Sequence, residues 1–290
     1  MKAAPQFTDP EKTALRGLLD DPTPAVRAAL LEHFQRHGRQ SLEFLSDIVR
    51  GSNRLLARHA AWYLGELRFT DPVAEFRGFI RSMNYELETG VLLLSRTANP
   101  DLDCGACCTF LDQLAARCRE ITPAPATTRE RCRILNRVLF HEYGFRGNTE
   151  HYTDPLNSFI DQVLQRRKGI PISLSIVYLL VAQRLSLPLE PVGAPTHFLI
   201  GCYEEEAPFF VDAYRQGAIL TAGEVFALLR ASHVVPQVAD LAPTPVREVL
   251  CRWCRNLVQH YTAANDPVSA RLFAEFVSEF EATYERHASS

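Results

Sequence analysis

Apolar residues recur every three or four positions between Glu11 and Glu120, a spacing that predicts a succession of amphipathic helices. Short segments rich in Asp, Pro, Gly, Ser or Asn interrupt this pattern, and such residues end one helix and begin the next. These segments are Asp20–Pro24, Arg36–Gly38, Gly51–Asn53, Thr70–Pro72 and Asn99–Asp101. The helices starting near Ala25, Leu56 and Leu87 resemble one another at intervals of about 31 residues, which indicates stacked helix pairs of the HEAT-like kind. An irregular helical bundle is the alternative. On one of these helices, Arg58, His59 and Trp62 share a face, where ordinary packing is the expectation.

The middle of the chain has a different pattern. A Pro-rich break, Ile121–Thr128, precedes a predicted helix over Arg129–Tyr143 and a polar loop over Gly144–Pro155. We expect a second helix over Leu156–Arg167, capped by Asp154 or Asn157 and ended by Gly169. Ile170–Leu185 is apolar almost all round, which predicts a buried helix with Pro171 in its first turn.

Strands follow this buried helix. A short extended piece, Leu189–Val192, precedes a predicted hairpin of Pro195–Cys202 and Ala207–Tyr214. If Tyr203–Glu206 form a four-residue turn, Cys202 faces Ala207, and counting outward places His197 directly opposite Asp212. Facing residues are close enough for an imidazole to donate a hydrogen bond to a carboxylate, although a one-residue slip would destroy this pairing.

A His–Asp pair becomes a catalytic triad only with a nucleophile. Cys202 lies an odd number of positions from His197, so it would point to the opposite face of the strand. The first turn of the buried helix is the better place, because a helix N-terminus lowers the pKa of a thiol and stabilises an oxyanion. That turn contains Pro171, Ser173 and Ser175 but no cysteine.

Composition restricts the classes of function. With 290 residues, 47% of them hydrophobic, and a net charge of −3, the chain is an ordinary globular protein and not a strongly basic nucleic-acid binder. No apolar stretch is long enough to span a membrane, and Met1–Gln6 lacks the apolar segment of a signal peptide, so we expect a cytoplasmic protein. No phosphate-binding Gly-rich loop or dinucleotide fingerprint is present, and we expect no cofactor.

The eight cysteines form two C-x-x-C pairs, Cys104/Cys107 and Cys251/Cys254. Together they would suffice for a four-thiolate zinc site. Both pairs lie in helix-like segments almost 150 residues apart, without the Gly-rich knuckles usual in zinc ribbons. Buried structural cysteines are the preferred interpretation, because free cysteine packs as a small hydrophobe.

Several segments together resemble the SirB-type subfamily of transglutaminase-like proteins, which belong with the papain-like cysteine enzymes. The resemblance covers roughly residues 85–285. The segments that carry it are Leu92–Arg96, Asn99–Asp103, Gly144–Asn148, Tyr152–Ser158, Arg167–Ser173, Leu187–Gly193, Thr196–Leu199 and Val211–Ala213. The resemblance implies an α+β, predominantly helical protein with a small antiparallel sheet in its core. It also implies a C-terminal helical hairpin, Val246–Ala264 and Val268–Arg286, of the tetratricopeptide-like kind.

We therefore expect three domains: a HEAT-like helical domain over 1–120, a transglutaminase-like core over 121–235 and a C-terminal helical hairpin over 236–290. A single helical hairpin does not bury its own apolar face, so it should dock on the core or on a partner. The side chains of Cys251, Cys254 and Leu257 should then be buried.

The resemblance also implies roles for individual residues. His197 and Asp212 match the family's His and Asp positions, whereas the family's Cys falls at Pro171, or at Ser173 if the helix start shifts. The resemblance further places a polar cluster beside the site, although turn and cap chemistry would explain the same residues. The members of this cluster are Asn148, Tyr152, Asp154 and Asn157.

Two functions follow. The first is a transglutaminase-like protein without the catalytic cysteine, which acts as a regulatory or protein-binding module with a protein or peptide as its partner. The second is a hydrolase or acyltransferase of the protease or amidase type that uses Ser173 with His197 and Asp212. A serine needs a base to deprotonate it during attack, so the second function requires the Ser173 hydroxyl within hydrogen-bond reach of His197. Without such contact, Ser173 is simply a first-turn hydroxyl of the helix.

Overall fold

The computed structural model describes residues 7–67 and 71–288, and the side chains of 286–288 are left out of the description. The chain divides into two compact units, Met1–Asp71 and Pro72–Ser290. Residues 1–6, on which the signal-peptide argument rests, and Thr70 of one predicted break lie outside the described residues. Within the described ranges, no helix combines the length and the apolar content needed to cross a bilayer.

The first unit consists of helices, as its apolar spacing predicts. A capping box between Thr8 and Glu11 starts the first helix, and Pro24 lies in the first turn of the second. Phe34, Leu45 and Tyr63 are at most 1% exposed and form the centre of a separate hydrophobic core. The helices are α1 (Asp9–Leu18), α2 (Pro24–Arg36), α3 (Gly38–Arg50) and α4 (Arg54–Leu67).

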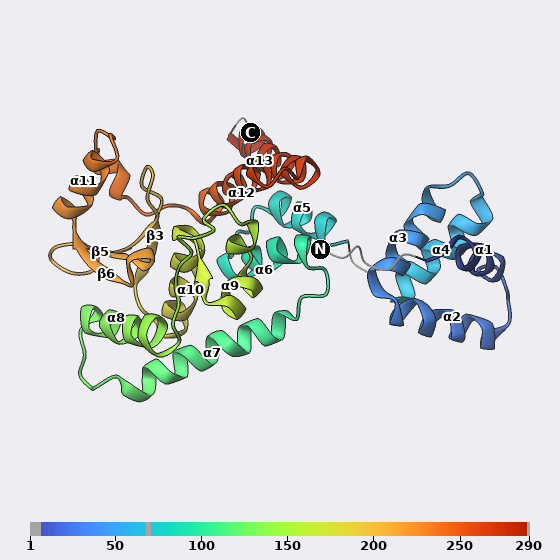
Figure 1. Ribbon diagram of the computed structural model, residues 1–290, viewed down its shortest axis with the longest axis horizontal. Helices are drawn as coiled ribbons and strands as arrows, with labels where there is room; N and C mark the ends of the chain where they lie inside the picture. The colour runs from blue at the N-terminus through green and yellow to red at the C-terminus, as the bar shows by residue number, and fades with distance from the viewer. Residues whose placement is uncertain (1–6, 68–70, 289–290) are drawn as a thin grey trace. The chain divides into compact units, whose positions relative to one another are not determined.

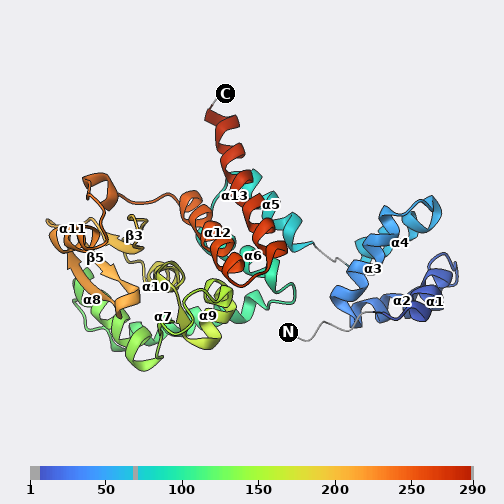
Figure 2. The same ribbon diagram turned by 45° about the horizontal axis from the view of Figure 1, so that its top comes forward.

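The second unit is built around one buried helix, α10 (Pro171–Arg184). Residues 172–182 are all buried, which agrees with the almost continuous apolar sequence of this segment. Figure 1 and Figure 2 show α10 between the four-stranded sheet and the helices α7 and α9, with which it makes direct contact. The helices that precede α10 in this unit are α5 (Pro72–Ser82), α6 (Leu87–Ala98), α7 (Cys104–Ile121), α8 (Thr128–Asn136) and α9 (Ile160–Arg166).

The Pro-rich break separates two helices, as the sequence predicts. The first, α7, ends at Ile121, and the second, α8, begins at Thr128. The helix predicted over Arg129–Tyr143 begins as α8 but continues as a π-helix, η1 (Arg137–Glu142). The helix predicted over Leu156–Arg167 is shorter, since a 3₁₀ turn, η2 (Pro155–Ser158), precedes α9. Asp154 is the residue that caps this turn, whereas Asn157 lies within the turn and does not cap it. α9 ends at Arg166, and its C-cap residue Arg167, not Gly169, adopts the left-handed conformation that terminates the helix.

An antiparallel sheet of four strands, in the order β3-β4-β5-β6, covers one side of α10. The extended piece predicted over Leu189–Val192 is confirmed as β3. A separate pair of two-residue strands, β1 (Arg146–Gly147) and β2 (Lys168–Gly169), is parallel. The other strands are β4 (Leu199–Cys202), β5 (Phe209–Asp212) and β6 (Ala218–Thr221), with η3 (Ala213–Arg215) between the last two and α11 (Ala222–Ala231) after them.

The hairpin register predicted from the sequence is wrong by two residues. Cys202 pairs with Phe209 and not with Ala207, so the connection is longer than the assumed four-residue turn. One reason is Pro208, which has no N–H to give to the ladder and delays the start of β5. At the other end, β4 starts only at Leu199, because the preceding Thr196 has a positive φ of 61°. His197 therefore lies in a loop and not opposite Asp212.

The last two helices form the predicted hairpin. They are α12 (Val246–Ala263) and α13 (Pro267–Ala288), preceded by the 3₁₀ turn η4 (Val238–Leu241). Cys251, Cys254 and Leu257 are fully buried, which confirms the prediction for this helix face. The hairpin packs within its own unit against α5, where Phe76 and Phe276 meet edge to face with ring centroids 4.9 Å apart.

Candidate functional site

The first turn of α10 contains the position at which a nucleophile was sought. Ser173 is 0% exposed, and its hydroxyl is engaged by backbone groups on both sides. Ser173 Oγ donates to the carbonyl oxygen of Asn157 over 2.7 Å and accepts from the amide of Ile170 over 3.0 Å. A second carbonyl, that of Ile170, lies 3.2 Å away. This geometry is that of a hydroxyl that joins the helix start to the loop before it.

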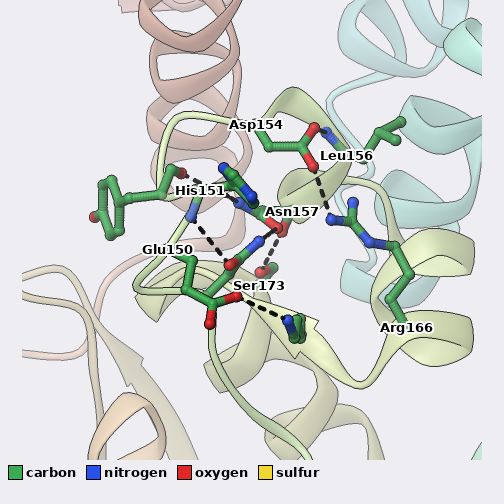
Figure 3. A network of polar contacts seen from close by, with 10 residues as sticks. Glu150, His151, Asp154, Leu156, Asn157, Arg166 and Ser173 are labelled. Carbon is green, nitrogen blue, oxygen red and sulfur yellow. Dashed lines mark hydrogen bonds and ion pairs between the residues drawn. The ribbon is translucent and has the colours of Figure 1, made fainter.

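Two asparagines hold that loop from the inside, and Figure 3 shows how the network surrounds Ser173. The buried Asn148 donates through Nδ2 to Oδ1 of Asn157 over 2.9 Å, and its Oδ1 accepts from the His151 amide. Asn157 Nδ2 donates to the carbonyls of His151, over 2.7 Å, and Tyr152. Apart from the amide contact between Asn148 and Asn157, these hydrogen bonds all hold loop backbone, so the two asparagines act mainly as supports of the loop.

Charged groups surround this network at the surface. Asp154 accepts from the Leu156 amide, and it forms an ion pair with Arg166 over 2.7 Å. Lys168 and Glu150 form a longer ion pair of 3.4 Å. Figure 3 shows Asp154 and Arg166 pointing toward each other from opposite ends of the segment that contains η2 and α9. This arrangement closes the polar loop over the start of α10.

Asp212, at the end of β5, is 3% exposed. Its Oδ1 accepts from the amides of Tyr214 and Arg215, so the carboxylate caps the short η3 turn. Burial raises the pKa of Asp212 above its ordinary value, while the Arg215 amide and guanidinium, the Tyr214 amide and the charge of His197 act in the opposite direction. His197 is thus near enough to influence Asp212 electrostatically.

The imidazole of His197 has a different hydrogen-bond partner. Its Nδ1 lies 3.0 Å from Oγ1 of Thr196. Within the described part of the chain, no hydrogen bond joins His197 to Asp212 or to Ser173. The structure therefore places His197 and Asp212 in one neighbourhood without the hydrogen-bonded relay of a working triad.

Arg252, on α12, is a residue of this neighbourhood that sequence reasoning missed. Its guanidinium donates to the carbonyl of Ala194 over 2.8 Å and to that of His197 over 3.0 Å. Burial lowers the pKa of Arg252, and the partial charge of Tyr152 opposes that shift. One side chain thus fixes the loop that carries His197, from a helix more than fifty positions away in the sequence. No local pattern in the sequence indicates such a contact.

The same face of α12 presents His260 to the polar loop. The His260 ring meets Tyr152 edge to face at 6.0 Å, and Tyr152 meets Tyr214 at 6.3 Å. His260 is 5% exposed, and its Nδ1 has no hydrogen-bond partner among the described residues. Burial lowers the pKa of His260, although the charge of Asp154 partly opposes this. Tyr152 itself is 45% exposed, so this row of rings reaches the surface.

The eight cysteines all lie in the described part of the chain, and six of them are buried. Burial raises the pKa of every one, to about 11 for Cys107 and Cys132 and to about 12 for Cys118. A thiol with a raised pKa is protonated at neutral pH and is a poor nucleophile. No group of three or more His, Cys, Asp or Glu side chains in the described ranges is arranged to hold a metal ion, which leaves the zinc alternative without a site there.

Comparison with known proteins identifies relatives of this region. A UPF0162 protein of Xylella fastidiosa is 34% identical over 190 residues, which are 62% of this chain and 66% of the relative. A UPF0162 protein of Vibrio cholerae is 33% identical over 165 residues, 57% of this chain and 60% of the relative. Mouse F-box only protein 21 is 39% identical over 132 residues, 43% of this chain but only 21% of the relative.

The chain thus spans less than two thirds of the length of these relatives. No solved structure matches it significantly. The sequence profile of the transglutaminase-like superfamily matches residues 106–255, a range that runs from α7 into α12 and includes α10, the sheet and Arg252. The chain belongs to the transglutaminase-like superfamily.

Proposed function

We propose that this chain is a SirB-type transglutaminase-like protein without a working nucleophile, which acts as a regulatory or protein-binding module in the cytoplasm. On this proposal the vestigial triad is Ser173, His197 and Asp212, and the helices on either side of the core provide surfaces for partners. The HEAT-like domain over 1–120 and the tetratricopeptide-like hairpin over 236–290 belong to this proposal.

The observation that carries the proposal is the environment of Ser173. The hydroxyl is fully buried, and its single proton goes to the Asn157 carbonyl while its lone pair receives the Ile170 amide. A serine nucleophile instead directs its proton toward a base and its lone pair toward a substrate. Reaching that state would break two backbone hydrogen bonds in a buried turn, a cost of about 1–3 kcal/mol for each group left unpaired.

The thiols support the same conclusion. Transglutaminase-like chemistry depends on a cysteine at the start of the helix, and the resemblance puts that position at Pro171, or at Ser173 if the helix start shifts, neither of which is a cysteine. The other cysteines do not replace it, because each of them has a raised pKa and six are buried.

The relatives support the idea of a module. The same segment recurs in chains of different size, and in mouse F-box only protein 21 it makes up a fifth of the protein. A domain that is reused inside larger proteins fits a role in assembly or regulation. The identity of the partner does not follow from this comparison.

The alternative is a hydrolase or acyltransferase that uses Ser173 with His197 and Asp212. It requires the loop around Asn157 to release the hydroxyl when a substrate binds. The electrostatic effect of His197 on the buried Asp212 carboxyl is what supports it.

Labelling with a fluorophosphonate, which reacts with activated serines, separates the two. Wild-type protein, Ser173→Ala and His197→Ala are treated with the probe, and adducts are located by mass spectrometry after each variant has been shown to fold by circular dichroism. The proposal expects no adduct on Ser173. An adduct on Ser173 that disappears in His197→Ala would establish the hydrolase instead.

A further inference from the structure

Helix α4 presents an exposed aromatic and basic face that the helical core of its unit does not use. Leu55, Arg58, His59 and Trp62 lie along this face, and together with Arg27 of α2 they line a shallow hollow of about 410 Å³. Leu55 is 55% exposed and Trp62 is 41% exposed. We call these five residues the α4 surface. The sequence pattern predicts ordinary packing for this face, but Trp62 is too exposed to be a core residue.

Trp62 lies at the edge of the unit's core and keeps 41% of its surface exposed. Ala60 and Tyr63 of α4 are at most 1% exposed and belong to this core, and the Tyr63 ring meets the Trp62 ring edge to face at 4.9 Å. The guanidinium of Arg27 lies over the Trp62 ring at 5.6 Å from its centroid. This cation–π contact orders a large apolar ring at the surface before anything binds. Ordered tryptophan and arginine side chains are the residues that most often dominate binding energy at protein interfaces.

The charge of the α4 surface is positive. Arg58 is exposed and forms no ion pair with any described residue, and Arg54 precedes it by one turn. Arg27 donates to the backbone carbonyl of Asp21, and the Asp21 carboxylate lies close enough to act on it. Glu66 follows Trp62 by one turn on the same helix. The free guanidinium of Arg58 beside Leu55 and Trp62 combines an apolar contact with an unneutralised positive charge.

We propose that the α4 surface binds an acidic segment of a partner protein, in which a leucine- or phenylalanine-like side chain lies between Asp or Glu residues. The apolar side chain would pack on Trp62 and Leu55, while the carboxylates would pair with Arg58 and Arg27. This assignment names the partner chemistry for the proposed protein-binding role and rests on it.

A nucleic acid fits the α4 surface less well. Single-stranded nucleic acids need a groove of several cations that follows the phosphates, and the net charge of the chain is −3. Here, two guanidiniums and one imidazole surround the hollow, and Leu55 adds an aliphatic contact that suits a side chain better than a base.

The test uses the full chain and a fluorescein-labelled synthetic peptide in which Glu and Asp flank a Leu-Phe pair. Binding is measured by fluorescence anisotropy at low and at physiological salt. We expect Trp62→Ala to weaken binding more than about tenfold, as for an anchor residue. We expect Arg58→Glu to weaken it several-fold and to reduce its salt dependence. Arg16→Glu, which reverses an exposed charge elsewhere in the same unit, is the matched control and should change the affinity less than about twofold.

A second readout reports the site directly. The chain has two tryptophans, Trp62 and the fully buried Trp253, so acrylamide quenches mainly Trp62. The acidic peptide should protect Trp62 from the quencher, whereas a peptide with Lys in place of Glu and Asp should not. Circular dichroism confirms that each variant is folded.

Three results would overturn the assignment: no binding of the acidic peptide, equal losses in Arg58→Glu and Arg16→Glu, or tighter binding of a single-stranded oligonucleotide at the same residues. These failures are distinguishable from failure of the proposed function. A missing peptide complex leaves the fluorophosphonate result on Ser173 unchanged, and labelling of Ser173 leaves the peptide measurement unchanged.

Discussion

Replacing Ser173 with alanine should destabilise the unit Pro72–Ser290, because the hydroxyl serves two buried backbone groups. The substitution removes the acceptor of the Ile170 amide, 3.0 Å away, and the donor to the Asn157 carbonyl, 2.7 Å away. The Ile170 carbonyl loses little, since it also accepts from the Leu174 amide. A buried group left without a partner costs about 1–3 kcal/mol, so two such groups give a loss of about 2–6 kcal/mol.

Ser175 is the matched control for this substitution. It lies in the same helix and is also 0% exposed, but its hydroxyl reaches one carbonyl, that of Phe198, over 3.4 Å. Such a long contact contributes little, so Ser175→Ala should cost less than about 1 kcal/mol. Both variants delete the same atom from the same kind of environment, and the difference between them isolates the contacts of Ser173.

Thermal unfolding, followed through Trp253 fluorescence, measures both variants in the unit that contains them. For a unit of this size, about 2–6 kcal/mol corresponds to a fall in Tm of about 4–24 °C. Ser175→Ala should lower the Tm by less than about 4 °C. Equal melting temperatures for the two variants would refute the assigned role of Ser173 and leave its hydroxyl free for other chemistry.

Three further predictions concern the neighbourhood of His197. Burial raises the pKa of the Asp212 carboxyl in the folded state. The stability that this carboxyl contributes is therefore complete below its unfolded-state pKa and is lost as the pH rises through its folded-state pKa. The unfolding free energy of Asp212→Asn minus that of wild type should therefore increase with pH over this acidic window, and a flat difference would contradict the burial argument. Burial lowers the pKa of His260 in the folded state. The stability that the neutral imidazole contributes is therefore present above the unfolded-state pKa of His260 and is lost as the pH falls below that pKa. His260→Phe should remove this loss in a pH series of chemical denaturations, and an unchanged series would contradict it. Arg252→Met should lower the free energy of unfolding by about 1.5–3 kcal/mol and accelerate amide exchange in the loop of His197. Arg255→Ala, which breaks an exposed ion pair on the same helix, is the control and should lower the free energy of unfolding by less than about 1 kcal/mol. Equal costs for the two arginine variants would show that the loop is held by other contacts.

The helices were predictable because the information for them is local. Apolar spacing places α10, and the Pro-rich break sets the end of α7 and the start of α8. The hairpin α12–α13 follows from spacing as well, and its buried face at Cys254 and Leu257 agrees with the expectation. These features need no knowledge of residues distant in the sequence.

The strand register was not predictable in the same way. It depends on the length of the connection between β4 and β5, which Pro208 extends, and on the left-handed turn at Thr196. The predicted register placed His197 opposite Asp212, whereas in the structure His197 lies in the loop before β4. A two-residue shift in register was therefore enough to change the interpretation of the site.

The polar cluster shows a further limit. Asn148 and Asn157 were chosen from a resemblance, but their role as internal ties of a loop appears only with the fold. Arg252 and His260 were missed because a helix outside the predicted core carries them. Side chains that act across long sequence separations leave no local pattern to find.

The central claim is that this transglutaminase-like domain has no activated thiol. The most direct test is the rate at which iodoacetamide alkylates each cysteine of the native protein at neutral pH, followed by peptide mass spectrometry. The account predicts that all eight cysteines react more slowly than free cysteine, with the six buried ones reacting only after unfolding. A cysteine that reacts faster than free cysteine in the native protein, and slows in a folded His197→Ala variant, would contradict the account.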